Sequence, residues 1–341
     1  MTSPEGTRAG ATSQKGARPV AVPRAGSGGE HPLHEQVRFG VLGASSWVAR
    51  DSVLPALDAS PKAVVVRTAS LAAGERYEEV LADPAVEAVY LPLPNGLHRE
   101  WTIRAAEAGK HVLCEKPLAP TAADASAMAH ACEAAGVLLC EAYMTPYHPR
   151  STAVADVVRS GRLGPLRFGH AAFRFTHRDP KDHRWQVAMG GGALADLGVY
   201  CLVPLLGAAG APPLAVAASA VLGGDGVDAS FAALLSFADG FTATVDCSFE
   251  GPEHQRLELV GTAASVVVER AFTPGPEDTA VELRHADGTT ERVESGGGNA
   301  YRGMVDHVCA AIRGDTALRR PAAASIAALA VMDDLRAAAL R

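Results

Sequence analysis

The stretch His111-Val-Leu-Cys-Glu-Lys-Pro-Leu-Ala-Pro-Thr121 holds the pattern from which the fold can be read. An apolar run, typical of a buried parallel strand, ends at Cys114, and Pro117 prevents any strand or helix from continuing. Glu115 and Lys116 lie between them. The simplest interpretation is a structural salt bridge, but adjacent side chains of a strand point to opposite faces. We therefore expect separate roles for the two charges.

The same alternation of apolar runs and helical segments extends to both sides of this stretch. Apolar runs typical of buried strands lie at residues 37–43, 63–69, 86–94 and 137–143. Segments with helical spacing lie between them, at residues 46–57, 77–84, 97–109 and 121–136. Strands that alternate with helices in this way predict right-handed crossovers and a doubly wound parallel sheet of the nucleotide-binding type.

After residue 150 the pattern changes to alternating apolar and polar residues. Alternation predicts antiparallel strands, with turns at Asp239-Gly240 and Asp287-Gly288, and two helices are expected to end the chain. We therefore expect an α/β protein with two domains. Residues 36–150 would form the nucleotide-binding domain, and residues 151–341 an α+β domain with a large open, mainly antiparallel sheet. Residues 1–35, rich in Gly, Ser, Pro and Arg, are predicted to form a disordered arm.

Composition limits the classes of partner. Of the 341 residues, 48% are hydrophobic and 20% charged, as in soluble globular proteins. The net charge of −7 argues against nucleic acid or an anionic membrane as a partner. We expect no membrane span, since no run of about 18 apolar residues is evident, and no metal, since zinc-site spacing is absent. Six cysteines without a C-x-x-C pair predict buried side chains in a reducing compartment, hence a cytoplasmic protein.

A glycine-rich turn, Gly40-Val-Leu-Gly43-Ala-Ser-Ser46, closes the first predicted strand. Glycines at a strand-to-helix turn let the backbone approach a pyrophosphate, which then lies at the helix N-terminus. Ser46 stands where a third glycine would be, and an ordinary tight turn is the alternative. The position after the first strand favours a dinucleotide site formed by Gly40, Gly43, Ala44, Ser45 and Ser46.

Other cofactor contacts are expected where later strands end. Arg67 near the end of the second strand, in place of an acidic residue, suits the 2′-phosphate of NADP, although an exposed strand-end arginine is the alternative. Ligands of open α/β sheets bind outside the carboxyl ends of the strands. That rule predicts a cleft lined by Leu93, Pro94, Asn95, His98, Glu115 and Lys116, although His98 could instead cap its helix.

Two further residues complete the predicted chemistry. An ammonium such as Lys116 at a cofactor cleft can polarise a carbonyl or hold an alkoxide. In Gly190-Gly-Gly-Ala-Leu-Ala-Asp196-Leu-Gly-Val-Tyr200 the last two named residues are four apart and share a helix face. A tyrosine hydroxyl near a lysine can donate the proton in carbonyl reduction. The alternative is a buried tyrosine hydrogen-bonded to Asp196.

In combination, these motifs resemble those of the glucose–fructose oxidoreductase/inositol dehydrogenase (Gfo/Idh/MocA) family. The resemblance runs from about residue 37 to the C-terminus and rests on residues 40–43, 92–98, 115–118, 141–149 and 190–200. It implies an NAD(P)-dependent oxidoreductase of sugars, cyclitols or nucleotide-sugars, with a Rossmann domain followed by an α+β domain. It also implies a homodimer or homotetramer built on the open sheet.

The resemblance assigns roles to individual residues. Lys116 would be the catalytic lysine, and Tyr200 would donate the proton at a position where many members carry histidine. The tyrosine version resembles the branch containing dihydrodiol and xylose dehydrogenases and the 3-ketoreductases of deoxysugar pathways. Expected substrate contacts are Tyr143, His183, Arg184, Trp185, Asp196 and Tyr200. Arg178 and Lys181 belong to a basic segment that would suit a diphosphate, or form only a solvated loop.

We expect reduction of a sugar or nucleotide-sugar ketone by NADPH. The alternatives are an NADP-dependent dehydrogenase of a free sugar or a trans-dihydrodiol, and a catalytically silent NAD(P)-binding regulatory subunit. One departure bears on the cofactor: the segment after Arg67 spans in about ten residues what family members fill with a helix and a short strand. The adenosine side of the site is therefore expected to be truncated or rebuilt, and NAD remains an alternative to NADP.

Overall fold

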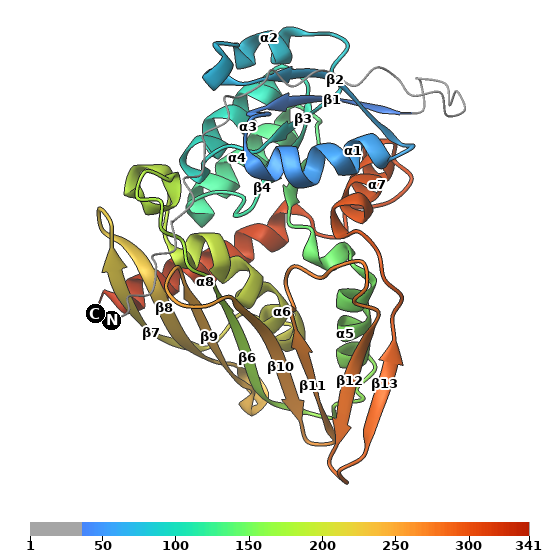
Figure 1. The fold of residues 1–341 in the computed structure, drawn as a ribbon, viewed down its shortest axis with the longest axis vertical. Helices are drawn as coiled ribbons and strands as arrows, with labels where there is room; N and C mark the ends of the chain where they lie inside the picture. The colour runs from blue at the N-terminus through green and yellow to red at the C-terminus, as the bar shows by residue number, and fades with distance from the viewer. Residues whose placement is uncertain (1–35, 341) are drawn as a thin grey trace, which may run out of the picture.

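A computed structural model describes residues 36–340, and the predicted N-terminal arm lies outside the described residues. The chain forms two sheets, one above the other in Figure 1. The first has five strands in the order β2-β1-β3-β4-β5. Their bounds are β1 (Val37–Leu42), β2 (Ala63–Ala69), β3 (Ala88–Leu91), β4 (His111–Glu115) and β5 (Leu139–Ala142).

Every pair of neighbours in this sheet is parallel, which confirms the predicted doubly wound topology. Strands β3, β4 and β5 are buried almost throughout, as continuous apolar runs require. The crossover helices are α1 (Leu54–Ala59), α2 (Tyr77–Ala82), α3 (His98–Glu107) and α4 (Ala122–Ala134). Thr121 caps α4 by accepting a hydrogen bond from the amide of Asp124.

The second sheet has eight strands in the order β13-β12-β11-β10-β6-β9-β8-β7. Their bounds are β6 (Leu166–Arg174), β7 (Ala215–Gly223), β8 (Val227–Ser236), β9 (Thr242–Ser248), β10 (His254–Gly261), β11 (Ala264–Glu269), β12 (Ala280–His285) and β13 (Thr290–Glu294). Only β6 and β9 pair in parallel, so the predicted mainly antiparallel sheet is confirmed. Asp239 and Gly240, with φ of 61° and 76°, form the turn between β8 and β9.

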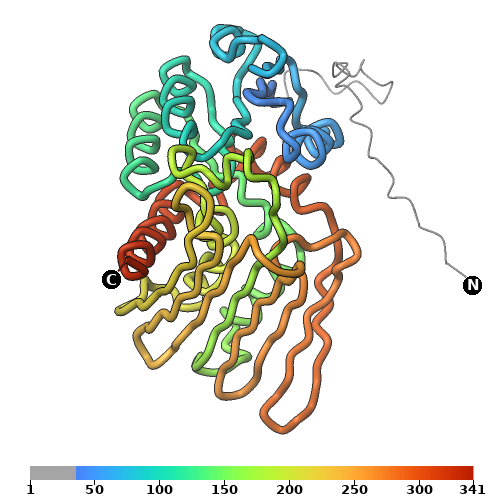
Figure 2. Tube along the Cα trace, turned by 60° about the vertical axis from the view of Figure 1, so that its left-hand side comes forward, coloured from blue at the N-terminus to red at the C-terminus, as the bar shows by residue number. Residues whose placement is uncertain are grey.

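Helices cover one face of the second sheet and connect it to the first. α5 (Pro149–Arg159) and α6 (Val199–Ala209) lie on the inner face (Figure 1). α7 (Ala300–Ile312) returns to pack against α1 and β2, and α8 (Ala322–Ala339) packs against α4 and β7. Figure 2 shows α8, in red, between the Rossmann helices and the yellow strands. The opposite face of the sheet exposes Phe168 and Leu234.

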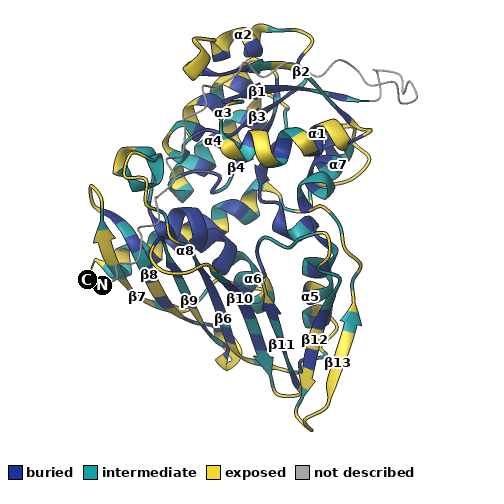
Figure 3. Cartoon of the chain, viewed as in Figure 1, coloured by how far each residue is buried: buried dark blue, intermediate teal, exposed yellow. Residues whose placement is uncertain are grey.

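One apolar segment was not foreseen. The stretch Val187–Ala209 is long and apolar enough to cross a membrane by length and composition, so the expectation that no such run exists was wrong. In the fold, 61% of its most apolar window is buried. α6, whose first turn is buried (dark blue in Figure 3), packs against β6, β9 and α8 in the second domain.

Candidate active site

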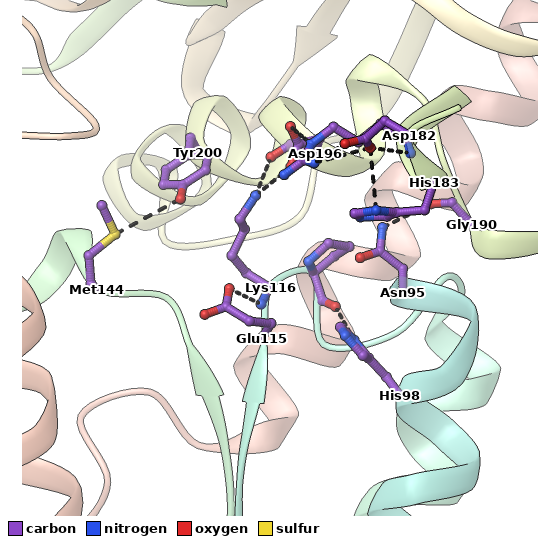
Figure 4. Close-up of polar contacts among 12 residues, drawn as sticks. Asn95, His98, Glu115, Lys116, Met144, Asp182, His183, Gly190, Asp196 and Tyr200 are labelled. Atoms are coloured by element: carbon purple, nitrogen blue, oxygen red, sulfur yellow. Dashed lines mark hydrogen bonds and ion pairs between the residues drawn. The ribbon is translucent and has the colours of Figure 1, made fainter. Parts of the chain in front are cut away.

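The site lies at the carboxyl edge of the first sheet, where the chain leaves β4 (Figure 4). The first strand-to-helix turn has the geometry that a pyrophosphate requires. Gly43 adopts φ of +101°, and a Cβ added there would lie 3.0 Å from Leu93 Cδ2. Ser46 Oγ accepts a hydrogen bond from the amide of Ala49 at 3.2 Å, in the π-helix η1 (Ala49–Val53) that leads into α1. The first-turn amides of a helix have no acceptors within it. This turn therefore fits a dinucleotide.

Two predicted cofactor residues have structural roles instead. Gly40 lies inside β1, and a Cβ there would meet Val80 Cγ1 at 2.4 Å, so this glycine lets α2 approach the sheet. Arg67 forms ion pairs with Glu79 at 3.2 Å and Asp83 at 3.3 Å on α2 and its end. The prediction that Gly40 and Arg67 contact the cofactor is therefore not supported, because the flanking helix occupies both.

The end of β2 differs from what the sequence suggested. The Ser70 hydroxyl donates to Ser45 Oγ at 2.8 Å, which joins this strand end to the glycine turn. Glu75 Oε2 accepts the Ser70 amide at 2.8 Å, so a carboxylate lies where the adenosine ribose is expected. Leu71 follows with its side chain exposed. A carboxylate and an apolar side chain at this point offer no cation to a 2′-phosphate.

His98 and Asn95 hold loops together. His98 is fully buried, with Nε2 2.8 Å from the Leu93 carbonyl oxygen and Nδ1 3.0 Å from that of Pro117. It joins the loops after β3 and β4 and does not line the cleft as predicted, since none of its surface is accessible. Asn95 Nδ2 donates to the Gly190 carbonyl at 2.9 Å, so its amide contacts the second domain.

Glu115 and Lys116 have separate partners, as strand alternation predicts. Glu115 Oε1 accepts the Tyr90 hydroxyl at 2.7 Å, and Oε2 accepts the backbone amide of Lys116 at 3.2 Å. Burial raises the pKa of Glu115. The Lys116 amine turns the other way, toward the second domain (Figure 4). It donates to Asp196 Oδ1 at 2.7 Å and to the Asp196 carbonyl at 2.9 Å.

Asp196 belongs to a line of alternating charges. Its second oxygen accepts Arg184 Nε at 3.0 Å, and Arg184 Nη1 lies 3.2 Å from Asp182 Oδ1. Burial acts to raise the pKa of Asp196, but the charges of Lys116 and Arg184 outweigh it and hold the pKa well below its usual range. The carboxylate therefore stays ionised between two cations. His183, whose pKa burial lowers, lies beside Asp182 (Figure 4).

Tyr200 forms the other side of the site. It stands in the first turn of α6, directly after the π-helix η7 (Leu194–Gly198) that carries Asp196. The Lys116 amine lies 4.9 Å from the centre of its ring. The Tyr200 hydroxyl faces Met144 Sδ at 3.9 Å, and burial raises its pKa well above the ordinary value. The phenol is protonated and has only a weak acceptor.

Two other predicted substrate residues support the site from behind. Tyr143 is buried and packs edge-on against the Tyr200 ring, with centroids 5.4 Å apart. It buttresses Tyr200, so the prediction of direct substrate contact is not supported. Trp185 stacks on His177 at 6.2 Å and meets Phe249 edge-on, in contact with the β7–β8 hairpin at Gly223. No contact of Trp185 reaches Lys116.

The glycine run explains how the second domain meets the first. A Cβ on Gly190 would lie 3.2 Å from the Asn95 side chain, and one on Gly191 would lie 2.3 Å from the Arg184 carbonyl oxygen. Gly192, with φ of +112°, would meet the Asp228 carboxylate at 2.2 Å. The predicted close backbone approach exists, but it is to protein groups of both domains. It places Arg184 and Asp196 opposite Lys116.

A cavity of about 250 Å³ lies elsewhere. It is an apolar space between α5 and α6, bounded by Tyr143 and Phe272, on the far side of these rings from Tyr200. The ionised side chains and the strand ends converge instead around Lys116.

Several residues of the site escaped sequence reasoning. Met144 lies in the motif of residues 141–149 but was given no role. Asp182 carries no motif, and Asp228, which accepts the Leu194 amide at 2.6 Å, lies in an ordinary strand pattern. Trp47 is a different case, because a large exposed aromatic residue directly after the glycine turn could have been singled out. Long-range pairings such as that of Lys116 with Asp196 leave no periodic signal.

Comparison with known proteins identifies the family. Residues 38–143 match the oxidoreductase family with an NAD-binding Rossmann fold, and residues 152–267 match the GFO/IDH/MocA C-terminal domain. A dTDP-3,4-didehydro-2,6-dideoxy-alpha-D-glucose 3-reductase of Saccharopolyspora spinosa is 35% identical over 312 residues, covering 86% of this chain and 92% of the relative. A D-xylose 1-dehydrogenase (NADP(+)) of Haloferax volcanii is 36% identical over 263 residues, covering 73% and 80%.

A similar solved structure is that of a 3-ketoreductase from Actinomadura kijaniata, in complex with NADP and TDP-benzene. It superposes with a TM-score of 0.81 at 29% identity and covers 89% of this chain and 98% of that one. The strand order and both domain matches agree with the resemblance read from the motifs. The chain belongs to the Gfo/Idh/MocA family of NAD(P)-dependent oxidoreductases.

Proposed function

We propose that this protein reduces a ketone of a sugar or nucleotide-sugar, most specifically the 3-keto group of a nucleotide-linked deoxysugar. The observation that carries the proposal is the convergence of an ammonium and a buried phenol at the carboxyl edge of the NAD-binding domain. The Lys116 amine lies 4.9 Å from the centre of the Tyr200 ring. The 35% identical 3-reductase supports the substrate class.

Lys116 and Tyr200 would divide the chemistry between them. The bound nicotinamide supplies a hydride to the carbonyl carbon. Lys116 stabilises the negative charge that develops on the reacting oxygen. Tyr200 donates the proton that completes the alcohol and regains one from solvent. Because its hydroxyl faces only a thioether, a substrate oxygen competes for it easily, and its raised pKa keeps the proton in place until then.

The cofactor would lie along the strand ends. Gly43, Ala44, Ser45 and Ser46 would hold the pyrophosphate, and the Leu93–Pro94 loop, which touches Gly43, would border the nicotinamide half. NADP is supported by its presence in the Actinomadura kijaniata structure. The position of Arg67 no longer supports it, and the Glu75 carboxylate at the end of β2 suits the free ribose hydroxyls of NAD. Either dinucleotide can therefore be tested as the hydride donor.

Cations near the cleft favour a nucleotide-sugar over a neutral sugar. Arg178 and Lys181 lie in the exposed loop just before His183, and neither side chain has an ion pair among residues 36–340. Their charges are free to meet a diphosphate. The second candidate is oxidation of a free sugar, which the Haloferax volcanii relative supports.

The test is a screen of nucleotide-linked ketosugars against free sugars and trans-diols. Oxidation of NADPH and NADH is followed at 340 nm for the ketones, and reduction of NADP⁺ and NAD⁺ for the alcohols. The proposal predicts turnover with the nucleotide-linked ketones. Turnover of free sugars alone would replace it with the dehydrogenase function, and binding of cofactor without turnover of any substrate would favour a regulatory subunit.

We further propose a cytoplasmic homodimer or homotetramer. The face of the eight-stranded sheet turned away from α5 and α6 exposes Phe168 and Leu234, with 64% and 44% of their surface accessible. Large apolar side chains on an open sheet face are typical of a surface that another subunit covers. Light scattering at micromolar concentration tests this, and a monomer would contradict it.

A further inference from the structure

Four charges alternate in sign from the second domain to the catalytic lysine. In order they are Asp182, Arg184, Asp196 and Lys116, and each contact lies between 2.7 and 3.2 Å. The side chains of Arg184 and Asp196 are 14% and 13% accessible, so solvent screens their interaction only weakly. Lys116 is the one member that the first domain contributes.

The division of Asp196 between two cations affects Lys116. Asp196 accepts a hydrogen bond from the Lys116 ammonium at Oδ1 and one from the Arg184 guanidinium at Oδ2. A carboxylate that faced Lys116 alone would offset most of the ammonium charge. Because Arg184 shares the carboxylate, an excess of positive charge remains beside the position of the reacting oxygen. Asp182, on the far side of Arg184, offsets part of the guanidinium charge in turn.

We propose that Arg184 is a positioning residue which, through Asp196, sets the positive potential that Lys116 presents to the reacting oxygen. Its guanidinium is held by two carboxylates and is not offered to the substrate, which revises the role expected from sequence. The inference rests on the proposed function insofar as Lys116 stabilises a developing alkoxide. The same potential would also act on the charge of the oxidised nicotinamide ring, and this effect does not depend on the substrate.

Two substitutions of opposite sign separate this role from a purely structural one. Arg184→Gln removes a positive charge from the line, and Asp182→Asn removes a negative one. Asp182 Oδ1 accepts the backbone amide of Arg184 at 2.9 Å and so caps the 3₁₀ turn η5 (His183–Trp185). The amide oxygen of asparagine can accept the same hydrogen bond, so Asp182→Asn preserves this cap. A structural role predicts that both changes lower activity. The electrostatic role predicts opposite effects.

In single-turnover reduction of a ketone that the wild type accepts, Arg184→Gln is expected to slow the hydride-transfer step about tenfold, less than the loss of a direct oxyanion donor. Asp182→Asn is expected to leave that step unchanged or faster, and Arg184→Lys to retain most of the rate. Arg292→Gln, on the exposed edge strand β13, removes one positive charge far from the line of charges and is the control, which should match the wild type. If Arg184→Gln does not fold, Asp182→Asn and Arg184→Lys still test the sign.

A binding measurement makes the inference independent of any substrate. The oxidised nicotinamide carries a positive charge that the reduced ring lacks. The ratio of Kd for oxidised over reduced cofactor, measured by quenching of tryptophan fluorescence or by calorimetry, should therefore fall about fivefold in Arg184→Gln and rise in Asp182→Asn. If the wild type reduces no ketone, the proposed function fails while this ratio still tests Arg184. Equal ratios in all variants, or shifts of the same sign in both, would overturn the inference.

Discussion

The carboxyl ends of β4 and β2 lie on the same sheet and are built in opposite ways. After β4, every charged group near Lys116 has a partner: Glu115 binds Tyr90, and Lys116 shares Asp196 with Arg184. After β2, Leu71 is exposed, and Arg67 has turned away to pair with α2. Groups fixed before the substrate arrives need no reorganisation during the reaction, so they favour catalysis. The difference indicates that the side chains are fixed in place around Lys116, whereas the described residues at the adenosine end include no fixed cation that would select NADP.

The largest expected effect is at the β4 end. Lys116→Ala should lower kcat about 10³-fold, because it removes the cation that stabilises the developing alkoxide. Kd of the reduced cofactor should change little, since the proposed pyrophosphate site is at the glycine turn. Stopped-flow reduction with the accepted ketone measures the chemical step. Lys62→Ala, at the amino end of β2, is the control. Unchanged turnover in Lys116→Ala would show that the reaction does not take place beside Lys116.

Tyr200→Phe should cost about 10²-fold in kcat, the usual contribution of a general acid. Phenylalanine keeps the ring beneath the Lys116 amine and the packing on Tyr143, and loses only the hydroxyl. Tyr143→Phe is the matched control, because Tyr143 buttresses Tyr200 from behind. The measurement is the pH dependence of kcat together with the solvent isotope effect. Equal losses in the two variants would assign Tyr200 to packing alone.

The fold and the reacting end were largely predictable from the sequence, and the reasons are local. The strands β2 and β4 were expected at their observed bounds, because apolar runs ended by turn residues specify them. Pro117 and strand alternation separated Glu115 from Lys116. Tyr200 and Asp196 were recognised from their spacing in a motif. Asp182, which pairs with Arg184, was not recognised, because it lies in an irregular loop where no periodic pattern marks it.

The adenosine end was predicted less well, for a physical reason. Arg67 was placed correctly in β2, but the choice of its partner depends on which acidic side chains α2 presents. Gly40 was taken for part of the phosphate turn, although its lack of a Cβ accommodates Val80. His98 was predicted to line the cleft because it follows a strand end. Its burial depends on the contact between the loops after β3 and β4, which the sequence does not reveal. Each of these residues makes a tertiary contact within the protein at the position where a cofactor contact was expected.

At the β2 end, Leu71→Arg should raise the preference for NADPH over NADH about tenfold, since it places a cation where a 2′-phosphate would lie. The change adds one charge-assisted contact to a site that lacks one. The measurement is the ratio of kcat/KM for the two reduced cofactors. Leu71→Gln controls for removal of the exposed apolar side chain, and an unchanged ratio in Leu71→Arg would place the adenosine away from the end of β2.

Asn95→Ala tests the link between the two ends and should have a smaller effect, about threefold on kcat/KM. It removes the hydrogen bond from Asn95 Nδ2 to the Gly190 carbonyl, whose net worth is about 1 kcal/mol, and so loosens the approach of the second domain to Lys116. Cofactor Kd should stay within error, because this amide is directed at the protein. A loss of cofactor affinity with unaltered kcat would return Asn95 to the predicted cofactor role.

The smallest effect is expected for Arg67→Ala. Its two ion pairs, to Glu79 and Asp83, lie at the surface, where such pairs contribute about 0–1 kcal/mol to the free energy of unfolding. The preference between NADPH and NADH should not change, because the guanidinium points to α2. Urea denaturation and the same kcat/KM ratio measure the two quantities. A selective loss of NADPH use would show that Arg67 leaves its ion pairs to bind the 2′-phosphate. The preference for NADPH would then arise from a rearrangement of Arg67 when the cofactor binds.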